Sequence, residues 1–153
     1  MPTTEGTQVT LRPVEQGDLE LMLAWRSLPS ISETTQVQGN RALAWEEHWN
    51  WWNGRTNRMD WLILYEGRRV GVVSLKNLSR FATPEISVYI GEQMLWGKGI
   101  GKQALREALD WLRDHHILGC RATIRPDNQR SIHLFESLGF VERNSQHYEL
   151  GIT

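Results

Sequence analysis

A glycine-rich stretch in the second half of the chain has the composition of an anion-binding turn. It reads Trp96-Gly-Lys-Gly-Ile-Gly-Lys102 and lies between a strand pattern and a helix pattern. At such a junction the first backbone N–H groups of the helix and the positive end of its dipole favour a phosphate group. Glycines let the chain pass close to that phosphate because they carry no Cβ. The stretch therefore predicts a phosphate-binding loop, with a glycine-rich turn that binds nothing as the alternative.

Two widespread phosphate-binding motifs do not fit this stretch. A P-loop would need a glycine at the position of Trp96 and a serine or threonine at that of Gln103. A dinucleotide fingerprint has the spacing G-x-G-x-x-G, whereas Gly97, Gly99 and Gly101 give G-x-G-x-G. Both motifs are excluded on residue type or spacing.

The stretch resembles the pyrophosphate-binding loop of the Gcn5-related N-acetyltransferases, whose pattern is Gln or Arg, two residues, Gly, one residue, Gly or Ala. Gly99 and Gly101 match the two small positions, and Trp96 replaces the Gln or Arg, as in the subgroup similar to the ribosomal-protein N-terminal acetyltransferases. Residues 128–140, which begin 29 residues after Gly99, resemble a later family motif in which an asparagine precedes a helix ending in Gly-Phe. The resemblance covers almost the whole chain.

The resemblance implies a reaction in which an amine attacks the thioester of acetyl-CoA. It implies that the pantetheine arm pairs with the strand before the loop, that the loop amides bind the pyrophosphate, and that Asn128 bonds the pantetheine. Asn128 would also suit the start of a helix, which is the alternative interpretation. The cofactor-binding residues expected on this basis are Tyr89, Ile90, Gly91, Gly97, Lys98, Gly99, Ile100, Gly101, Lys102 and Asn128.

Two residues are candidates for proton transfer. Glu85 lies 11 residues before Trp96, where some family members place a catalytic glutamate, and partial burial would suit it as a base. Its alternative is an ordinary carboxylate at the end of a strand. Many relatives carry a tyrosine as acid seven residues after the asparagine, but that position is Phe135, which has no proton to give. Ser131, one turn earlier, could hydrogen-bond the departing thiolate, or it could be an ordinary first-turn residue.

The acceptor is less defined than the donor. By resemblance, residues 30–52 and the segment His147–Glu149 line its groove. A protein N-terminal amine or a small-molecule amine fits, and an amino-sugar nucleotide of a surface-glycan pathway is an alternative. Two non-enzymatic interpretations stay open: a non-catalytic acyl-CoA-binding module, and a structural module whose tryptophan-rich helix is a dimer face.

The elements that must hold these residues follow from apolar periodicity. The order is β-α-α-β-β-β-α-β-α-β-β, which predicts an α/β (α+β) fold with a mixed, mainly antiparallel sheet of about six or seven strands and helices on both faces. Its splayed central strands are implied by the resemblance. The last helix is predicted from about Ser131 to Leu138. Trp45, Trp49 and Trp52 share one face of an earlier helix and are expected mainly to pack on the sheet.

Composition bounds the class of protein. The chain has 153 residues and a net charge of −1, which excludes a strong polyanion binder and gives no attraction to an anionic membrane. A single cysteine, Cys120, excludes an internal disulfide, and no histidine has metal-ligand spacing to a partner. We expect one domain over residues 1–153, cytoplasmic, monomeric or homodimeric, with no metal and no nucleic-acid or membrane partner.

Overall fold

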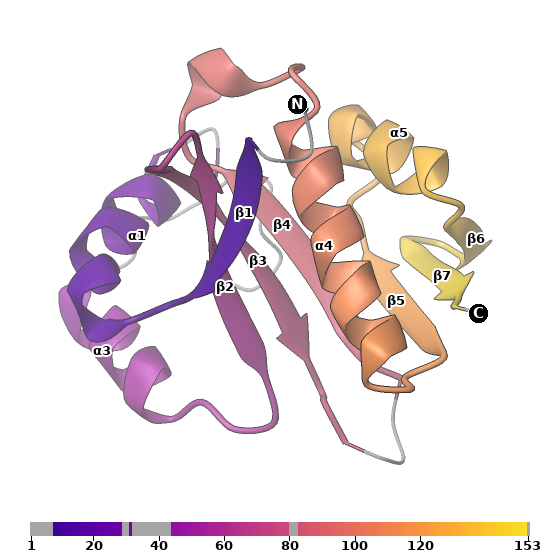
Figure 1. Cartoon of the computed structure of the whole chain (residues 1–153), viewed down its shortest axis with the longest axis horizontal. Coiled ribbons are helices and arrows are strands. Elements are labelled where there is room, and N and C mark those ends of the chain that lie inside the picture. The colour runs from indigo at the N-terminus through magenta and orange to yellow at the C-terminus, as the bar shows by residue number, and fades with distance from the viewer. Residues whose placement is uncertain (1–7, 29–30, 32–43, 80–82, 153) are drawn as a thin grey trace.

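The computed structural model describes residues 8–28, 31, 44–79 and 83–152. Their strands and helices follow the predicted order (Figure 1). The elements are β1 (Val9–Pro13), α1 (Leu19–Arg26), α3 (Trp45–Asn53), β2 (Met59–Tyr65), β3 (Arg68–Lys76), β4 (Glu85–Ile90), α4 (Ile100–Asp114), β5 (Gly119–Thr123), α5 (Gln129–Ser137), β6 (Val141–Asn144) and β7 (His147–Gly151). Two single-turn 3-10 helices, Gln16–Asp18 and Gln93–Leu95, precede α1 and α4.

The seven strands form one sheet in the order β1-β2-β3-β4-β5-β7-β6. All neighbouring pairs are antiparallel except β4 and β5, so the predicted mixed, mainly antiparallel sheet is confirmed. The tight β2–β3 turn is made by Glu66 and Gly67, whose φ angles are 51° and 81°. Positive φ at both central residues is the geometry that matches the twist of a two-residue hairpin.

The parallel pair β4–β5 touches over a very short length. Among the described residues the two strands are in register only at Glu85 and Arg121, where the Arg121 N–H donates to the Pro84 carbonyl at 2.9 Å. Beyond this point β4 runs on to Ile90 while β5 diverges from it. The sheet is therefore split at its centre, as the resemblance implied, and the split leaves a strand edge to which a ligand can pair.

Helices cover both faces of the sheet (Figure 1). The larger core joins α4 and α5 to one face, and the smaller core joins α1 and α3 to the other. Adjacent residues of β2 show the division, because Ile63 belongs to the larger core and Leu62 to the smaller. The apolar stripe of α4 is buried along its whole length: Ile100, Ala104, Leu105, Ala108, Leu109 and Leu112.

The tryptophan-rich helix α3 is oriented differently from the prediction. Its fully buried residue is His48, which is 0% exposed and stacks on Trp51 with an interplanar angle of 5°. Trp49 and Trp52 are half-buried against the smaller core, which confirms the expectation for most of this face, whereas Trp45 is 46% exposed. Because the inward face is centred on His48, Trp45 at the start of the helix stacks on Trp49 instead of on the sheet.

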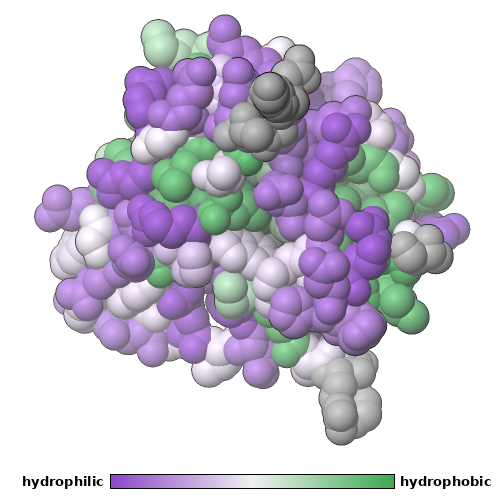
Figure 2. All heavy atoms as spheres, viewed as in Figure 1, coloured by the Kyte–Doolittle hydropathy of each residue, from purple (hydrophilic) through white to green (hydrophobic). Residues whose placement is uncertain are grey.

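The face of the molecule drawn in Figure 2 is largely polar. On the face drawn in Figure 2, hydrophilic side chains cover most of the area, and apolar side chains gather in separate patches. None of the helices in the described part of the chain is long and apolar enough to cross a membrane.

Candidate active site

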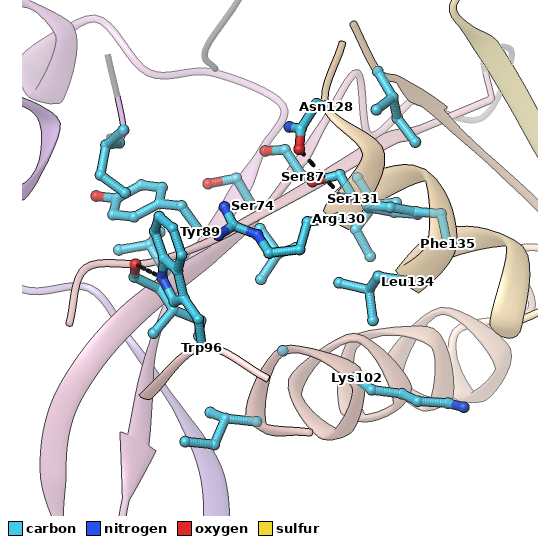
Figure 3. A pocket seen from close by; sticks show the side chains of 18 of the residues that line it. Ser74, Ser87, Tyr89, Trp96, Lys102, Asn128, Arg130, Ser131, Leu134 and Phe135 are labelled. Carbon is cyan, nitrogen blue, oxygen red and sulfur yellow. Dashed lines mark hydrogen bonds between the residues drawn. The ribbon is translucent and has the colours of Figure 1, made fainter. Parts of the chain in front are cut away.

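A cavity of about 660 Å³ opens where β4 and β5 separate (Figure 3). Its size is that of a small-molecule binding site. One wall comes from the glycine loop, the start of α4 and the helix α5, and the other comes from α1, α3 and the middle strands. We call these the donor wall and the acceptor wall.

The glycine loop of the donor wall has the shape that the sequence predicts. Gly97 and Gly99 both have φ of +81°, and apart from their chain neighbours no atom lies within 4 Å of the place a Cβ would take. The loop therefore leaves open space directly before the first amides of α4, which fits a pyrophosphate. The loop residues that line the cavity are Gly97, Gly99, Ile100, Gly101 and Lys102.

The two lysines of the loop are placed less favourably than the glycines. Lys98 is exposed and is not among the residues that line the cavity. Lys102 lines the cavity, but its ammonium group points away from the centre of the site (Figure 3). The structure thus supports a pyrophosphate site made mainly of backbone amides.

Trp96 connects the loop to both neighbouring elements. Its Nε1 donates to the carbonyl of Ile90 at 2.9 Å, which fixes the loop to the end of β4. The guanidinium of Arg130, in the first turn of α5, lies 3.3 Å from the centre of its ring and so spans the gap between loop and helix (Figure 3). Sequence reasoning missed Arg130. Arg130 follows Asn128 by two residues, and this position in the first turn of the same helix could have indicated that it lies at the cavity.

Asn128 begins α5 and lines the same cavity. Its Oδ1 accepts the N–H of Ser131 at 3.3 Å, so the helix-start interpretation of Asn128 is confirmed. This bond uses the side-chain oxygen and leaves the contact of its NH₂ group with pantetheine as a prediction. Ser131 is half-buried and also lines the cavity, and a bond from its hydroxyl to the thiolate stays a prediction.

The direction of each backbone N–H and C=O group along β4 determines which of them can bond a ligand in the split. The N–H of Gly91 donates to Val70 of β3 at 2.8 Å. Backbone groups of a strand alternate in direction, so those of Ile90 face the split and those of Tyr89 face β3. Gly91 is not among the residues that line the cavity. It packs against Trp25, because a Cβ on Gly91 would lie 2.3 Å from the indole ring. The Ile90 carbonyl already accepts from Trp96, so of the three predicted contacts on this strand the N–H of Ile90 is the one the geometry supports best.

Glu85 lies at the point where the central strands part. It is half-buried, lines the cavity, and its Oε2 is 3.7 Å from Nζ of Lys76 on β3. Phe135 lines the cavity as well, but it is 3% exposed and packs edge-on against Phe140. The cavity therefore brings together Glu85, the glycine loop and the start of α5, and the position of the family's tyrosine acid is filled by a buried phenyl ring.

The acceptor wall rests on a buried ion cluster around Asp60, whose side chain is 0% exposed. Arg58 donates to both carboxylate oxygens, at 3.0 and 2.8 Å, and Arg55 and Ser74 donate as well. Burial alone would raise the pKa of Asp60. The hydrogen bonds and charge of Arg58, with those of Ser74 and Arg55, outweigh burial and hold this pKa below its usual value.

Sequence reasoning placed the acceptor wall only in part. Of residues 30–52, Ile31 and Trp51 line the cavity, and residues 30 and 32–43 lie outside the described part of the chain. The segment His147–Glu149 is not in the lining, which corrects the expectation, because Tyr148 is buried in the larger core. Arg26 and Arg58 line the wall and were not predicted.

Cys120 takes no part in this site. It is buried, and burial raises the pKa of its thiol to about 12, so it remains protonated near neutral pH. It lies on β5 and packs in the larger core.

Residues 8–141 match the acetyltransferase (GNAT) domain family. The chain belongs to this family. Because the family consists of acetyltransferases, the expected enzyme class is confirmed, whereas the ribosomal subgroup is not shown.

An uncharacterized protein of Methanocaldococcus jannaschii is 43% identical over 89% of this chain, but the match covers only 28% of that protein's length. YwnH of Bacillus subtilis, named provisionally as a phosphinothricin acetyltransferase, is 30% identical over 88% of this chain and 85% of its own length.

Solved structures show the same GNAT fold. A domain from Methanocaldococcus jannaschii superposes with a TM-score of 0.86 at 41% identity, over 94% of this chain and 98% of the domain. Spermidine N-acetyltransferase from Vibrio cholerae, in complex with CoA and spermine, superposes with a TM-score of 0.81 at 19% identity, over 95% of this chain and 96% of its own. The second match is distant enough that it supports the fold alone.

Proposed function

We propose that the chain is an acetyl-CoA-dependent N-acetyltransferase that acetylates a primary amine. The observation that carries the proposal is a single cavity at the β4–β5 split that joins the open glycine loop to a half-buried carboxylate, Glu85. The loop and α5 supply a place for the donor, and the opposite wall supplies a separate place for the amine. One domain over residues 1–153 and a cytoplasmic location remain part of this proposal.

The residues divide the chemistry as follows. Acetyl-CoA supplies a thioester whose carbonyl carbon is open to attack by an amine. Glu85 accepts the proton that the amine must lose, directly or through a water, as the C–N bond forms and the C–S bond breaks. Ser131 donates a hydrogen bond to the sulfur as the thiolate leaves. Phe135 cannot serve as acid, so the departing thiolate is stabilised by the hydrogen bond from Ser131 and takes its proton from solvent.

The donor site is proposed on the fit between the chain and the cofactor. The amides of residues 97–102 and the N-terminus of α4 would hold the pyrophosphate. The Ile90 backbone and the Asn128 amide would bond the pantetheine arm, and Arg130 would add positive charge between the loop and α5. Lys98 and Lys102 would act at longer range, because Lys98 does not line the cavity and the ammonium group of Lys102 points away from its centre.

The acceptor is proposed as a class rather than a compound. A small-molecule amine or a protein N-terminus, as in the ribosomal subgroup, suits an open cavity of this size. The names of the relatives add phosphinothricin and polyamines as compounds to test, and an amino-sugar nucleotide is the remaining alternative. We propose that the chain acts as a monomer or a homodimer.

The decisive experiment is a thiol-release assay with acetyl-CoA and a panel of amines. The panel should hold peptides with free N-termini, amino-sugar nucleotides, amino acids and polyamines. We expect thiol release that depends on one class of amine, together with calorimetric binding of acetyl-CoA in its absence. Binding without turnover for every amine would support the non-catalytic module instead, and no binding would reject the donor site.

A further inference from the structure

The end of β4 contacts elements from both walls of the cavity. Ile90 is the last residue of the strand, and Gly91 and Glu92 lead from it into the turn before the glycine loop. We call residues 90–92 the β4 junction. Its backbone and side chains are bonded to the loop on one side and to α1 on the other, so it is the place where the two walls are joined.

The β4 junction is bonded to the donor wall through two carbonyl groups. The carbonyl of Ile90 accepts the Nε1–H of Trp96 at 2.9 Å. The carbonyl of Glu92 accepts the N–H of Leu95 at 2.9 Å, across the single 3-10 turn Gln93–Leu95. Leu95 and Trp96 both line the cavity. A shift of the junction would therefore shift the beginning of the glycine loop.

The same junction is bonded to α1 through Trp25. The Nε1–H of Trp25 donates to Oε2 of Glu92 at 3.0 Å. The indole also packs on Gly91, where a Cβ would overlap the ring, and lies edge-on to Tyr89 of β4. Glycine at this position thus permits a close approach of α1 to the end of β4.

The bond between Trp25 and Glu92 is well placed to fix the orientation of α1. Trp25 is 2% exposed and Glu92 is half-buried, and a hydrogen bond to a carboxylate is stronger there than at an exposed site. Met22 and Arg26, on the same helix, line the cavity. Because neighbouring residues of a helix move together, the position of Trp25 determines where these two side chains lie.

From this arrangement we propose that Trp25 and Glu92 are positioning residues that couple the acceptor wall to the donor loop. Of the described residues that line the cavity neither is one, so both act through the groups bonded to them. The proposal rests on the proposed function and deepens it. Acetyl transfer needs the amine within about 3–3.5 Å of the thioester carbon. A small shift of α1 relative to the loop should therefore lower turnover more than it lowers the binding of acetyl-CoA.

Hydrogen exchange tests the coupling with CoA alone, before any acceptor is known. In the wild type, saturating CoA should slow amide exchange in the glycine loop, residues 97–102, and by at least about 3-fold in α1. In Glu92→Leu the loop should be slowed as in the wild type, while the effect on α1 falls below about 1.5-fold. Glu92→Gln keeps an oxygen that can accept the indole N–H and should restore the effect. Glu107→Leu, at an exposed position of α4, is the matched control and should resemble the wild type.

The outcomes of this experiment separate the coupling from the donor site. Equal slowing of α1 in the wild type and Glu92→Leu, or no slowing of α1 in the wild type, would overturn the proposal. No slowing of the loop in the wild type would reject the donor site and the proposed function with it. If Glu92→Leu does not fold, Trp25→Phe replaces it, because this variant removes the indole N–H and keeps an aromatic ring on Gly91.

Turnover gives a second measurement once the thiol-release assay has identified an acceptor. Trp25→Phe and Glu92→Leu should each lower kcat by about 10-fold, while the Kd for acetyl-CoA changes by less than about two-fold. The double variant should be no slower than the single variants, because both substitutions remove the same bond. Glu92→Gln should keep kcat within about three-fold of the wild type. A merely structural role would lower the urea midpoint and leave the kcat of the folded protein unchanged, and an unchanged kcat or a loss of about 100-fold in the double variant would reject the proposal.

Discussion

The two walls of the cavity differ in whether backbone groups or side chains form them. The donor wall consists of backbone and of residues close together in the sequence, within 96–102 and 128–135. The acceptor wall consists of side chains from separate elements, with Arg26 on α1, Trp51 on α3, Arg58 just before β2 and Lys76 on β3. A ligand group common to all acetyl donors can be bound by a short motif, whereas a particular acceptor needs side chains gathered by the fold.

This difference predicts that substitutions in the two walls have different effects on ligand binding and on stability. The donor wall needs particular backbone conformations, and its loss should abolish binding without unfolding the protein. The acceptor wall stands on a buried ion cluster, and its loss should unfold the protein as well as alter acceptor binding. Each substitution below changes one wall, and the measurement shows whether the function of the other wall is retained.

Asp60→Asn should have the largest effect. It leaves Arg58 and Arg55, which are only 18% and 23% exposed, without their carboxylate. Breaking a buried ion pair from one side costs roughly 3–5 kcal/mol of the free energy of unfolding, to be measured by urea denaturation. Asp110→Asn is the matched control, because Asp110 pairs with Arg113 at the surface and its loss should cost less than about 1 kcal/mol. Similar losses in both variants would show that the cluster does not support the wall.

The same carboxylate gives a pH dependence of stability. The pKa of Asp60 in the folded protein is lower than its ordinary value, so its stabilisation is complete above about pH 5 and is lost as the pH falls through the folded pKa. Asp18, which is bound by Arg12 and Arg69, acts in the same direction. We expect urea midpoints to fall with acid less steeply in Asp60→Asn than in the wild type. Parallel curves would mean that other carboxylates control acid unfolding.

Gly99→Glu should remove the donor site and leave the fold intact. The residue has φ of +81°, and a glutamate there would place a carboxylate in the space proposed for the pyrophosphate. We expect acetyl-CoA affinity to fall by at least about 100-fold, or roughly 2.7 kcal/mol, in calorimetry. Gly67→Glu is a close control because Gly67 has the same φ in the β2–β3 turn, outside the cavity lining. Retained binding in Gly99→Glu would remove the loop from the donor site.

The sequence predicted the elements well because their signals are local. The apolar stripe of α4 follows the helical period, and Glu66-Gly67 marks the hairpin turn. The start of α5 was placed about two residues late, since Asn128 caps the helix and Gln129 is already its first residue. A helix boundary depends on which side chain bonds the first free amide, and the periodicity of apolar residues does not report that.

The sequence predicted the donor wall but little of the acceptor wall. Gly97, Gly99 and Asn128 belong to short motifs, and all three line the cavity. Arg26 and Arg58 belong to no motif, and only the packing of α1 against the sheet brings them together. The cavity-lining tryptophan of α3 is Trp51 rather than one of the Trp45, Trp49 and Trp52 set, because the burial of His48 fixes how the helix is turned.

Glu85→Gln tests the group that lies where the two walls meet. If Glu85 accepts the amine proton, kcat should fall by about 100-fold with any good acceptor, which is the lower end for loss of a general base. Acetyl-CoA affinity should change by less than about two-fold, because the carboxylate lies at the start of β4 and the loop follows the end of that strand. Glu107→Gln, on the exposed side of α4, should match the wild type in both measurements. An unchanged kcat would exclude Glu85 as the base.

Arg130→Gln should have the smallest effect, because the donor wall is mainly backbone. The substitution removes the cation over Trp96 and one positive charge near the proposed pyrophosphate site. Cation–π contacts of this kind contribute about 0.5–2 kcal/mol, so acetyl-CoA affinity should fall by roughly 2- to 30-fold with kcat preserved. Arg106→Gln removes the same charge from the outer side of α4 and should leave the affinity unchanged. A large loss of affinity in Arg130→Gln would mean that the donor wall, like the acceptor wall, depends on a side chain that the fold brings into place.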